Sequence, residues 1–413
     1  MFFSDAPREK ESTAWLGVAA WTAFIYLTIP LARAIQETVR ERAGKEVFLW
    51  ITFLAFAAAA AWILRALFRR RWTARPSQLF VLSAVGGLFT CLIWSLRANP
   101  EEAFHFVQYG VLSILLFRAF SHRLRDPSIY LAAALAGAAL GILDELIQWV
   151  VPRRYFDYRD IWINAQAVGL VQIALAAGIR PARIRGRLSP AGLRTASRLA
   201  ILNLLLLLFC VNNTPRLQDA YARLIPAARR LDHLTAEYGF RIEAPGTGVF
   251  FSRLPPDELR RRDREEGARA GALLQAGART DPQYFRFLKE HLAHRDPLAV
   301  ETRIHLFRRD RHAAAVRDPQ TPDRLRFYAH VAHSENRILE SHFPQTLRHS
   351  SFQWPEERAQ LMERLAQPPA PYVSPVSRHL ITRFTQRQVS ALLLALLLAA
   401  VAAERLAARR NPA

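Results

Sequence analysis

The chain has 413 residues, of which 51% are apolar, and its 56 lysines and arginines far exceed its 35 aspartates and glutamates. Aromatic residues make up 11%, which excludes a largely disordered chain, and only three of the basic residues are lysines. The two cysteines lie within apolar stretches, which excludes a disulfide framework and a cysteine-based zinc site.

Apolar segments long enough to cross a membrane occur eight times along the chain. A helix needs about 20 mainly apolar residues to cross a hydrocarbon core of about 30 Å. The segments are residues 14–32, 47–64, 79–96, 103–120, 129–150, 161–179, 195–213 and 388–404. They predict an all-α polytopic membrane protein. A cleaved signal peptide is an alternative for the first segment, but its apolar stretch is too long and the residues before it are too mixed in charge.

The basic residues of the short loops indicate the orientation of these spans. Loops and tails on one side of the membrane contain 19 lysines and arginines, and loops on the other side contain 8. Because short loops rich in these residues stay in the cytoplasm, both termini are predicted to be cytoplasmic. The expected location is the bacterial cytoplasmic (inner) membrane, in which the protein is multi-pass.

A soluble domain is expected between the seventh and eighth spans. Residues 1–213 form the predicted membrane domain, residues 214–387 an extracytoplasmic domain, and residues 388–413 the last transmembrane helix with a cytoplasmic tail. The extracytoplasmic segment is long enough to bury a core of its own.

Local patterns predict that this extracytoplasmic domain is mainly helical, of α+β type. Helix starts are indicated at Thr214-Pro215 and Asp281-Pro282. Alternating apolar and polar residues at 240–243 and 303–307 predict a small sheet, and the run 306–312 is interpreted as a strand end entering a charged turn. The charged run 260–266 is interpreted as a solvated helix face.

Polar residues gather at one end of three consecutive predicted spans. Such groups are costly inside a membrane and are therefore usually functional. In chain order they are His105, Tyr109, Asp144, Glu145, Gln148, Asp160 and Asn164. Residues four apart share a helix face, so each span presents a polar pair at a similar depth. A shared pocket is the economical explanation. The alternatives are interfacial residues in water, or a polar clamp between the three helices.

The same residues resemble the signatures of the VanZ-like membrane family, over about residues 80–180. The stretch 100–110, PEEAFHFVQYG, is similar to the first signature. The second is matched by Asp144-Glu145-Leu146-Ile147-Gln148, Pro152-Arg153-Arg154, Phe156-Asp157, Asp160 and Asn164.

Three positions depart from the family pattern. Glu102 replaces the lysine of an acid–lysine pair, and Arg153 and Ala167 replace glycines, which leaves Arg154 as the matching arginine. The resemblance implies a membrane protein of the bacterial cell envelope. It also implies a link to resistance against glycopeptides of the teicoplanin type, and it assigns no reaction.

The predicted site has the composition of an acid–base unit. A histidine facing carboxylates in a poorly hydrated pocket can transfer protons near neutral pH. In this hypothesis Asp144 or Glu145 orients His105, which removes a proton from an incoming hydroxyl. The seven polar span residues are the predicted catalytic set, and Glu101, Arg153 and Arg154 are predicted to bind substrate. Arginine suits the anionic headgroup of a membrane lipid or a lipid-linked glycan.

Two other classes of function remain open at this stage. The polar groups could form a packing core in a scaffold that presents the outer domain to an envelope-assembly protein. They could also form the proton relay of a transporter, although no inverted repeats or interrupted helices support that. Whether the protein is an enzyme is therefore not decided by its sequence.

No cofactor, metal or nucleic-acid partner is expected. The pairs His291/His294 and His330/His333 have no clear third ligand and are interpreted as helix-surface residues. The 214–387 segment contains 29 basic and 21 acidic residues, which is too mixed for a nucleic-acid surface.

Overall fold

A computed structural model describes most of the chain, and it is mainly helical. The described residues are 9–44, 46–69, 75–152, 154–225, 231, 234–244, 246, 248–277, 281–318, 321–368 and 370–409. The chain divides into two compact units, which we call the membrane unit (Met1–Val211 with Ser390–Ala413) and the soluble unit (Asn212–Val389).

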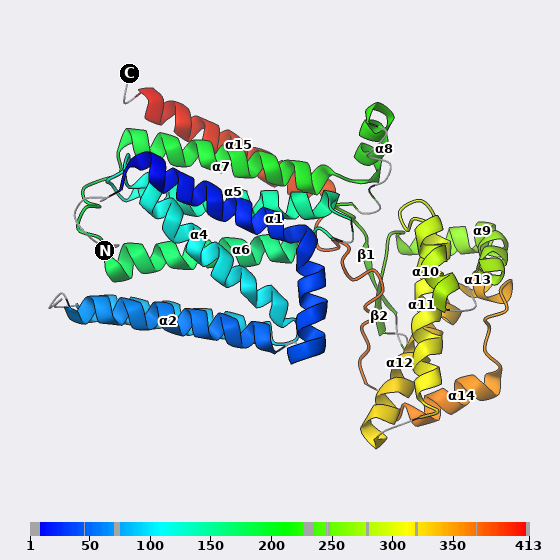
Figure 1. The fold of residues 1–413 in the computed structure, drawn as a ribbon. Coiled ribbons are helices and arrows are strands. Elements are labelled where there is room, and N and C mark those ends of the chain that lie inside the picture. The colour runs from blue at the N-terminus through cyan, green and yellow to red at the C-terminus, as the bar shows by residue number, and fades with distance from the viewer. Residues whose placement is uncertain are drawn as a thin grey trace. The chain divides into compact units, whose positions relative to one another are not determined.

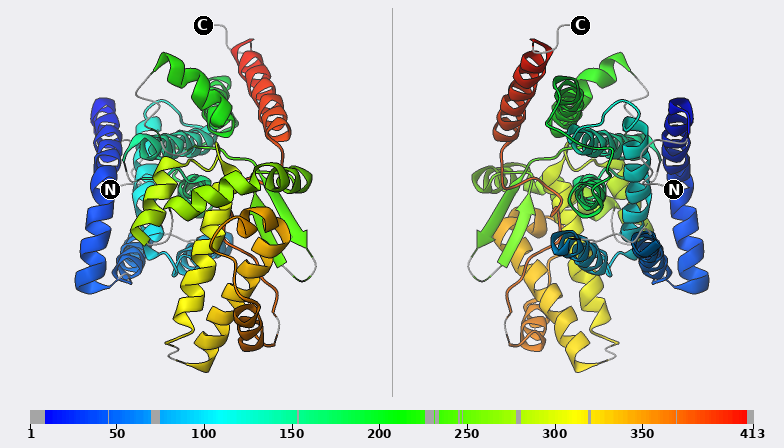
Figure 2. Two further views of the ribbon diagram at one scale, coloured as in Figure 1. Left: turned by 90° about the vertical axis from the view of Figure 1, so that its right-hand side faces the viewer. Right: turned by 90° about the vertical axis from the view of Figure 1, so that its left-hand side faces the viewer.

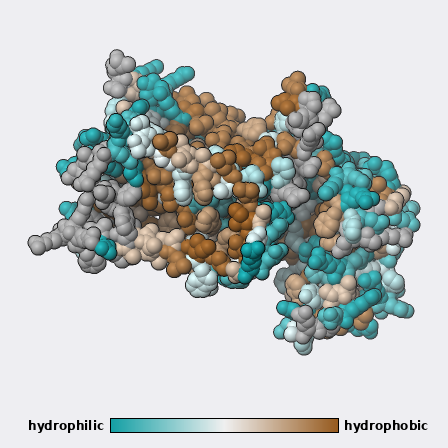
Figure 3. Space-filling model, viewed as in Figure 1, coloured by the Kyte–Doolittle hydropathy of each residue, from teal (hydrophilic) through white to brown (hydrophobic). Residues whose placement is uncertain are grey.

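The membrane unit is built from long apolar helices joined by short loops (Figure 1). They are α1 (Glu11–Ala43), α2 (Val47–Arg69), α3 (Pro76–Ser95), η1 (Pro100–Ala103), α4 (Phe104–Phe120), α5 (Ser128–Val150), α6 (Tyr158–Ile173), η2 (Ala174–Ile179), α7 (Pro190–Asn212) and α15 (Gln386–Arg409). Hydrophobic residues cover much of the visible surface of this unit (Figure 3).

Seven helical segments of the described chain are long and apolar enough to cross a membrane. They confirm seven of the eight predicted spans and the all-α polytopic fold. The remaining predicted span falls in α2, a helix of 23 residues whose described apolar part, Val47–Ala61, is shorter than the other seven segments.

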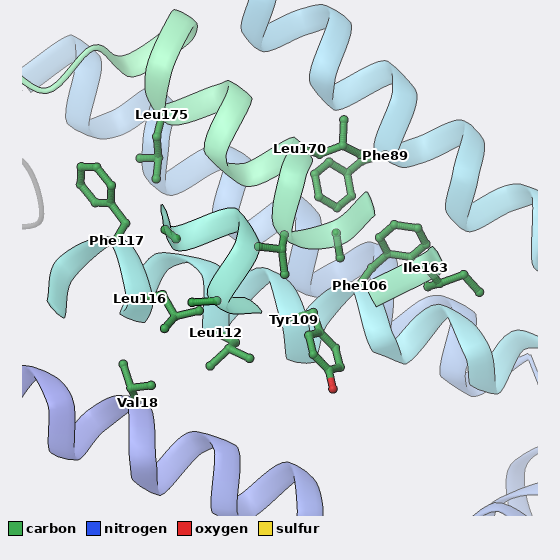
Figure 4. Packing of buried hydrophobic residues seen from close by; sticks show 14 of the residues in the cluster. Val18, Phe89, Phe106, Tyr109, Leu112, Leu116, Phe117, Ile163, Leu170 and Leu175 are labelled. Atoms are coloured by element: carbon green, nitrogen blue, oxygen red, sulfur yellow. The ribbon is translucent and has the colours of Figure 1, made fainter. Parts of the chain in front are cut away.

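Helices α4, α5 and α6 form the centre of the membrane unit and pack on one another. Small residues allow α5 and α6 to approach closely, since a Cβ atom added at Gly137 would meet the Val168 side chain at 2.7 Å. Helix α4 also packs against α1, since the side chains of Leu112 and Leu116 point from α4 towards Val18 of α1 (Figure 4). This packing holds the ends of the three central helices at fixed positions.

Helix α1 is longer than predicted, because it continues from the expected span through to Ala43. Figure 1 shows a bend in this helix (dark blue), after which its second part runs at a steep angle to the first. Pro30 lies inside α1 and explains a bend, since proline removes a backbone hydrogen bond and crowds the preceding turn. The residues expected to form an outer loop are therefore helical.

The soluble unit combines one hairpin with a group of helices. Strands β1 (Phe240–Ala244) and β2 (Gly248–Ser252) are antiparallel, with Phe240 opposite Ser252 (Figure 2). The helices are α8 (Pro215–Leu224), α9 (Pro256–Gly277), α10 (Asp281–Glu290), α11 (Pro297–Ala315), α12 (Pro322–His342), α13 (Pro344–Arg348) and α14 (Glu356–Leu365). The helix starts predicted at Thr214-Pro215 and Asp281-Pro282 and the strand predicted at 240–243 are confirmed.

Two predictions for this unit are wrong. Residues 303–307 and 306–312 lie inside α11 and form neither a strand nor a turn. Helix α11 is buried on several sides, so polar residues such as Arg303 and His305 face the interior, and the helical period is hidden in the sequence.

The charged run 260–266 is also only partly solvated. It lies on α9, where Arg261 forms exposed ion pairs with Glu258 and Glu265, as expected for a solvated face. Asp263 is instead 2% exposed. Its carboxylate accepts hydrogen bonds from the backbone N–H of Gln345 at 2.8 Å and of Thr346 at 3.0 Å, and from the Thr346 hydroxyl at 2.7 Å. Asp263 therefore joins α9 to the start of α13.

Candidate functional site

The polar residues predicted from the sequence lie where α4 begins, α5 ends and α6 begins. Tyr109, Glu145 and Asn164 have no exposed surface, and Asp144 and Gln148 are 2% and 3% exposed. The side chains of His105 and Asp160 retain 14% and 17% of their exposed surface. The structure brings these seven residues together, and we refer to them as the polar cluster.

His105 and Tyr109 occupy successive turns of α4, with their rings nearly parallel and 6.2 Å apart. The Tyr109 hydroxyl donates a hydrogen bond of 2.9 Å to Oδ2 of Asp144. Nε2 of His105 lies 3.9 Å from Oδ2 of Asp160, within ion-pair distance if the ring is protonated. One face of α4 therefore contacts a carboxylate from α5 and another from α6.

Glu145 has a different set of partners. Its carboxylate accepts hydrogen bonds from the Gln148 side chain at 2.7 Å and from the backbone N–H of Asp157 at 3.0 Å. Gln148 in turn accepts hydrogen bonds from the guanidinium of Arg154, with Nε at 3.0 Å. Glu145 thus ties the end of α5 to the loop before α6, and Asp160 is the carboxylate that forms the ion-pair contact with His105.

Several buried atoms of the polar cluster have no hydrogen-bond partner of acceptable geometry among the described residues. They are Nδ1 of His105, Oδ1 of Asp144, and both amide atoms of Asn164. Asn164 is held tightly in place, because a Cβ atom added at Gly141 would meet its Cβ at 2.9 Å. Unsatisfied buried polar atoms are costly, and their concentration in one place is typical of a site that binds a ligand.

A polar cavity of about 400 Å³ adjoins the cluster. Gln148 and Asp160 belong to both. The cavity is lined by Arg33, Gln36, Glu37, Arg40, Phe48, Glu101, Gln148, Arg154, Tyr155, Asp157 and Asp160. Its lining carries both signs of charge, which suits a ligand with an anionic group and further polar groups.

Four of the lining residues lie on the second part of α1 and were not predicted as site residues. Arg33, Gln36, Glu37 and Arg40 follow a spacing of three or four residues, which places them on one helix face. This spacing indicates a helix face, whereas the end of the apolar stretch near residue 32 predicts a loop here. Arg33 and Glu37 also form an ion pair at 3.4 Å.

The residues predicted to bind substrate are only partly described. Glu101 and Arg154 line the polar cavity, whereas Arg153 lies outside the described residues. Glu102, which stands where a lysine was expected, accepts a hydrogen bond from Asn99 at 2.9 Å and pairs with Arg159 at 3.0 Å. Among the described residues, no group of three histidine, cysteine, aspartate or glutamate side chains is arranged to hold a metal ion.

Comparison with known proteins identifies the family of this region. Residues 16–176 match the VanZ/LLP1 family model, and this range begins in α1, ends in η2 and contains the whole polar cluster. No curated protein and no solved structure matches the chain. The match confirms the resemblance seen at about residues 80–180 and extends it towards the N-terminus. The chain is therefore a multi-pass membrane protein that contains a VanZ/LLP1 region at residues 16–176, and the polar cluster lies inside this region.

Proposed function

We propose that the VanZ-like region binds an anionic amphiphile of the bacterial cell envelope, a lipid or a lipid-linked glycan, and acts on its headgroup. The observation that carries the proposal is the set of unsatisfied buried atoms in the polar cluster beside a cavity lined by three arginines. A link to glycopeptide resistance of the teicoplanin type is suggested by the family alone.

The arginines of the cavity provide the contacts for a headgroup. Arg154 is fixed by its hydrogen bonds to Gln148, and Arg33 and Arg40 face the same space from α1. A guanidinium matches the geometry of phosphate or carboxylate, because it presents paired N–H groups in one plane. An arginine that is already ordered loses less conformational entropy when the ligand binds.

The histidine provides the proton-transfer group. With Nε2 towards Asp160, the unpaired Nδ1 of His105 can accept a proton from a ligand hydroxyl, and Asp160 then stabilises the resulting positive charge. Asp144, held by Tyr109, adds a second negative charge near the ring. The carboxylates thus offset part of the cost of burial, which disfavours the protonated ring that this step produces.

The proposal places the site at the outer face of the cytoplasmic membrane, with both termini in the cytoplasm. It is supported by the excess of lysine and arginine in the loops at the opposite ends of the helices. A lipid headgroup is accessible at that depth, since the polar cluster lies at helix ends.

Mass spectrometry of envelope lipids and glycan precursors tests the proposal. A deletion strain is complemented with the wild-type chain, with His105→Ala, or with Ser113→Ala. Ser113 is a matched control, because it is also buried between α4 and α6 but, within the described part of the chain, its hydrogen bonds are to Val168 and Gln172. A species altered by the deletion should be restored by wild type and by Ser113→Ala, but not by His105→Ala. Restoration by His105→Ala at equal membrane abundance would instead support a scaffold.

A further inference from the structure

A second cavity of the membrane unit is apolar and lies between α2, α3, α4 and the α6–η2 segment. Its volume is about 550 Å³. Its lining is almost wholly aliphatic, aromatic or glycine, and includes Phe56, Leu82, Phe89, Val107, Ile114 and Leu175. We call it the apolar groove. Nothing in the polar cluster accounts for it, because none of the seven cluster residues lines it.

The apolar groove begins close to the polar cavity. Phe48 of α2 lines the polar cavity, and Thr52, one helical turn further, lines the groove. The Thr52 hydroxyl donates a hydrogen bond to the Phe48 carbonyl, so these two residues are in direct contact. On α4, Phe106 of the groove directly follows His105 of the polar cluster. A polar and an apolar compartment therefore follow each other along the same helices.

The length of the groove matches one leaflet of a bilayer. Along α4 the lining runs from Phe106 to Arg118, which is about 18 Å at the rise of an α-helix. Half of a hydrocarbon core of about 30 Å is about 15 Å. A lipid chain whose headgroup lies at the helix ends would reach this depth.

Two glycines provide part of the space. Gly86 of α3 and Gly110 of α4 line the groove, and Cβ atoms added there would meet only Phe56 at 3.7 Å and Val171 at 3.9 Å. These distances are ordinary contacts, so a methyl group fits at either position, whereas a longer side chain would occupy the groove.

We infer that the apolar groove holds one hydrocarbon chain of the amphiphile whose headgroup occupies the polar cavity, an inference that rests on the proposed function. Three observations support this inference: the two cavities lie next to each other, the lining of the groove is apolar, and its length is close to that of one leaflet. The substrate class is thereby narrowed to a lipid with at least one extended chain, and a soluble headgroup analogue should bind more weakly than the intact lipid.

Photo-crosslinking in nanodiscs tests this inference. The full chain is placed in phosphatidylglycerol–phosphatidylethanolamine nanodiscs that contain phosphatidylglycerol with a diazirine in its acyl chain. After illumination, labelled residues are mapped by mass spectrometry. Gly86→Leu should remove labelling from the groove residues of α2 and α4. Gly87→Leu is the matched control, since Gly87 is exposed, lies next to Gly86 and does not line the groove.

Exposed residues such as Phe80 of α3 contact bulk lipid and should be labelled equally in both variants, which provides an internal reference. Equal groove labelling in Gly86→Leu and wild type would overturn the inference, as would crosslinks that show a helix of a second chain in the groove. The His105→Ala variant separates the two proposals. If His105→Ala keeps the groove labelling and also restores the envelope lipids of the deletion strain, the apolar groove still binds a hydrocarbon chain. The same result rejects the proton-transfer role of His105.

Discussion

Both units of the protein bury carboxylates, but they satisfy them differently. In the soluble unit, Glu335 has no exposed surface and accepts hydrogen bonds from four side chains. These are His305 at 2.6 Å, Arg308 at 3.0 Å, Tyr372 at 2.6 Å and Ser374 at 2.9 Å. This carboxylate joins α11 and α12 to the segment that leads back to α15, and it has little capacity left for a ligand.

In the membrane unit, Asp144 is almost as deeply buried, but among the described residues its carboxylate accepts one side-chain hydrogen bond, from Tyr109. Its other oxygen is unsatisfied, as are atoms of the neighbouring His105 and Asn164. A saturated buried carboxylate stabilises the fold, whereas an unsatisfied one beside a cavity costs stability and is available to a ligand. Under the proposed function, the number of partners, and not burial alone, separates the structural carboxylate Glu335 from the site carboxylate Asp144.

The largest expected effect is that of Glu335→Gln. The substitution removes a buried charge but leaves Arg308 and presents amide N–H groups to donors, so the soluble unit should lose about 3–5 kcal/mol of unfolding free energy. The loss is measured by thermal unfolding of the full chain in detergent, with limited proteolysis within residues 212–389 as the readout for the soluble unit. The control is Glu340→Gln on the exposed side of α12. An unchanged melting temperature for Glu335→Gln would contradict the structural role.

Acid should remove the same stabilisation. Burial by itself raises the pKa of Glu335, but the contacts with His305, Tyr372 and Arg308 outweigh burial and hold the pKa below its ordinary value of 4.5. A lowered folded-state pKa means that Glu335 stabilises the soluble unit above about pH 4.5 and that this contribution is lost as the pH falls further. The difference in melting temperature between wild type and Glu335→Gln should therefore shrink below pH 4.5. A difference that stays constant to pH 3 would argue against it.

Asp263→Ala should have the next largest effect. It leaves the N–H groups at the start of α13 without their acceptor, at a cost of about 2 kcal/mol. The neighbouring Arg264→Ala, at an exposed position of the same helix, should leave the melting temperature unchanged. Equal effects of the two variants would mean that the charged run on α9 is solvated throughout.

The smallest effect on stability is expected for Asn164→Ala. The amide of Asn164 has no hydrogen-bond partner of acceptable geometry among the described residues, so the variant should change the unfolding free energy by less than about 1 kcal/mol. The change in envelope lipids should nevertheless resemble that of the deletion strain. Thermal unfolding of the purified protein and lipid mass spectrometry measure the two effects. A large loss of stability would place Asn164 with Glu335 as a structural residue.

Much of the polar cluster could be predicted from spacing. A charged or amide group inside an apolar span is conspicuous, and the period of the helix indicates which groups share a face. The partners of Glu145 could not be predicted, because the hydrogen bond from the Asp157 backbone depends on how the loop between α5 and α6 folds back. The same holds for Asp263, which looks like its solvated neighbours until its acceptors on α13 are known.

Helix α1 shows the limit of assigning spans by hydropathy. Its polar continuation from Arg33 to Arg40 ends the apolar stretch but not the helix, since backbone hydrogen bonding does not require apolar side chains. Hydropathy alone therefore misses a set of cavity residues, because this segment supplies one wall of the polar cavity.

The sequence by itself determined the membrane class, seven of the spans, the VanZ-like region and the residues of the polar cluster. The membrane class, the spans and the polar cluster follow from local composition and period, which act over one or two helical turns, whereas the VanZ-like region follows from the resemblance of its motifs to a family. Only the tertiary structure decided which carboxylates are saturated, that α1 lines the polar cavity, and that an apolar groove begins beside it. Those features depend on distances between residues far apart in the chain, which packing between helices sets and local pattern does not encode.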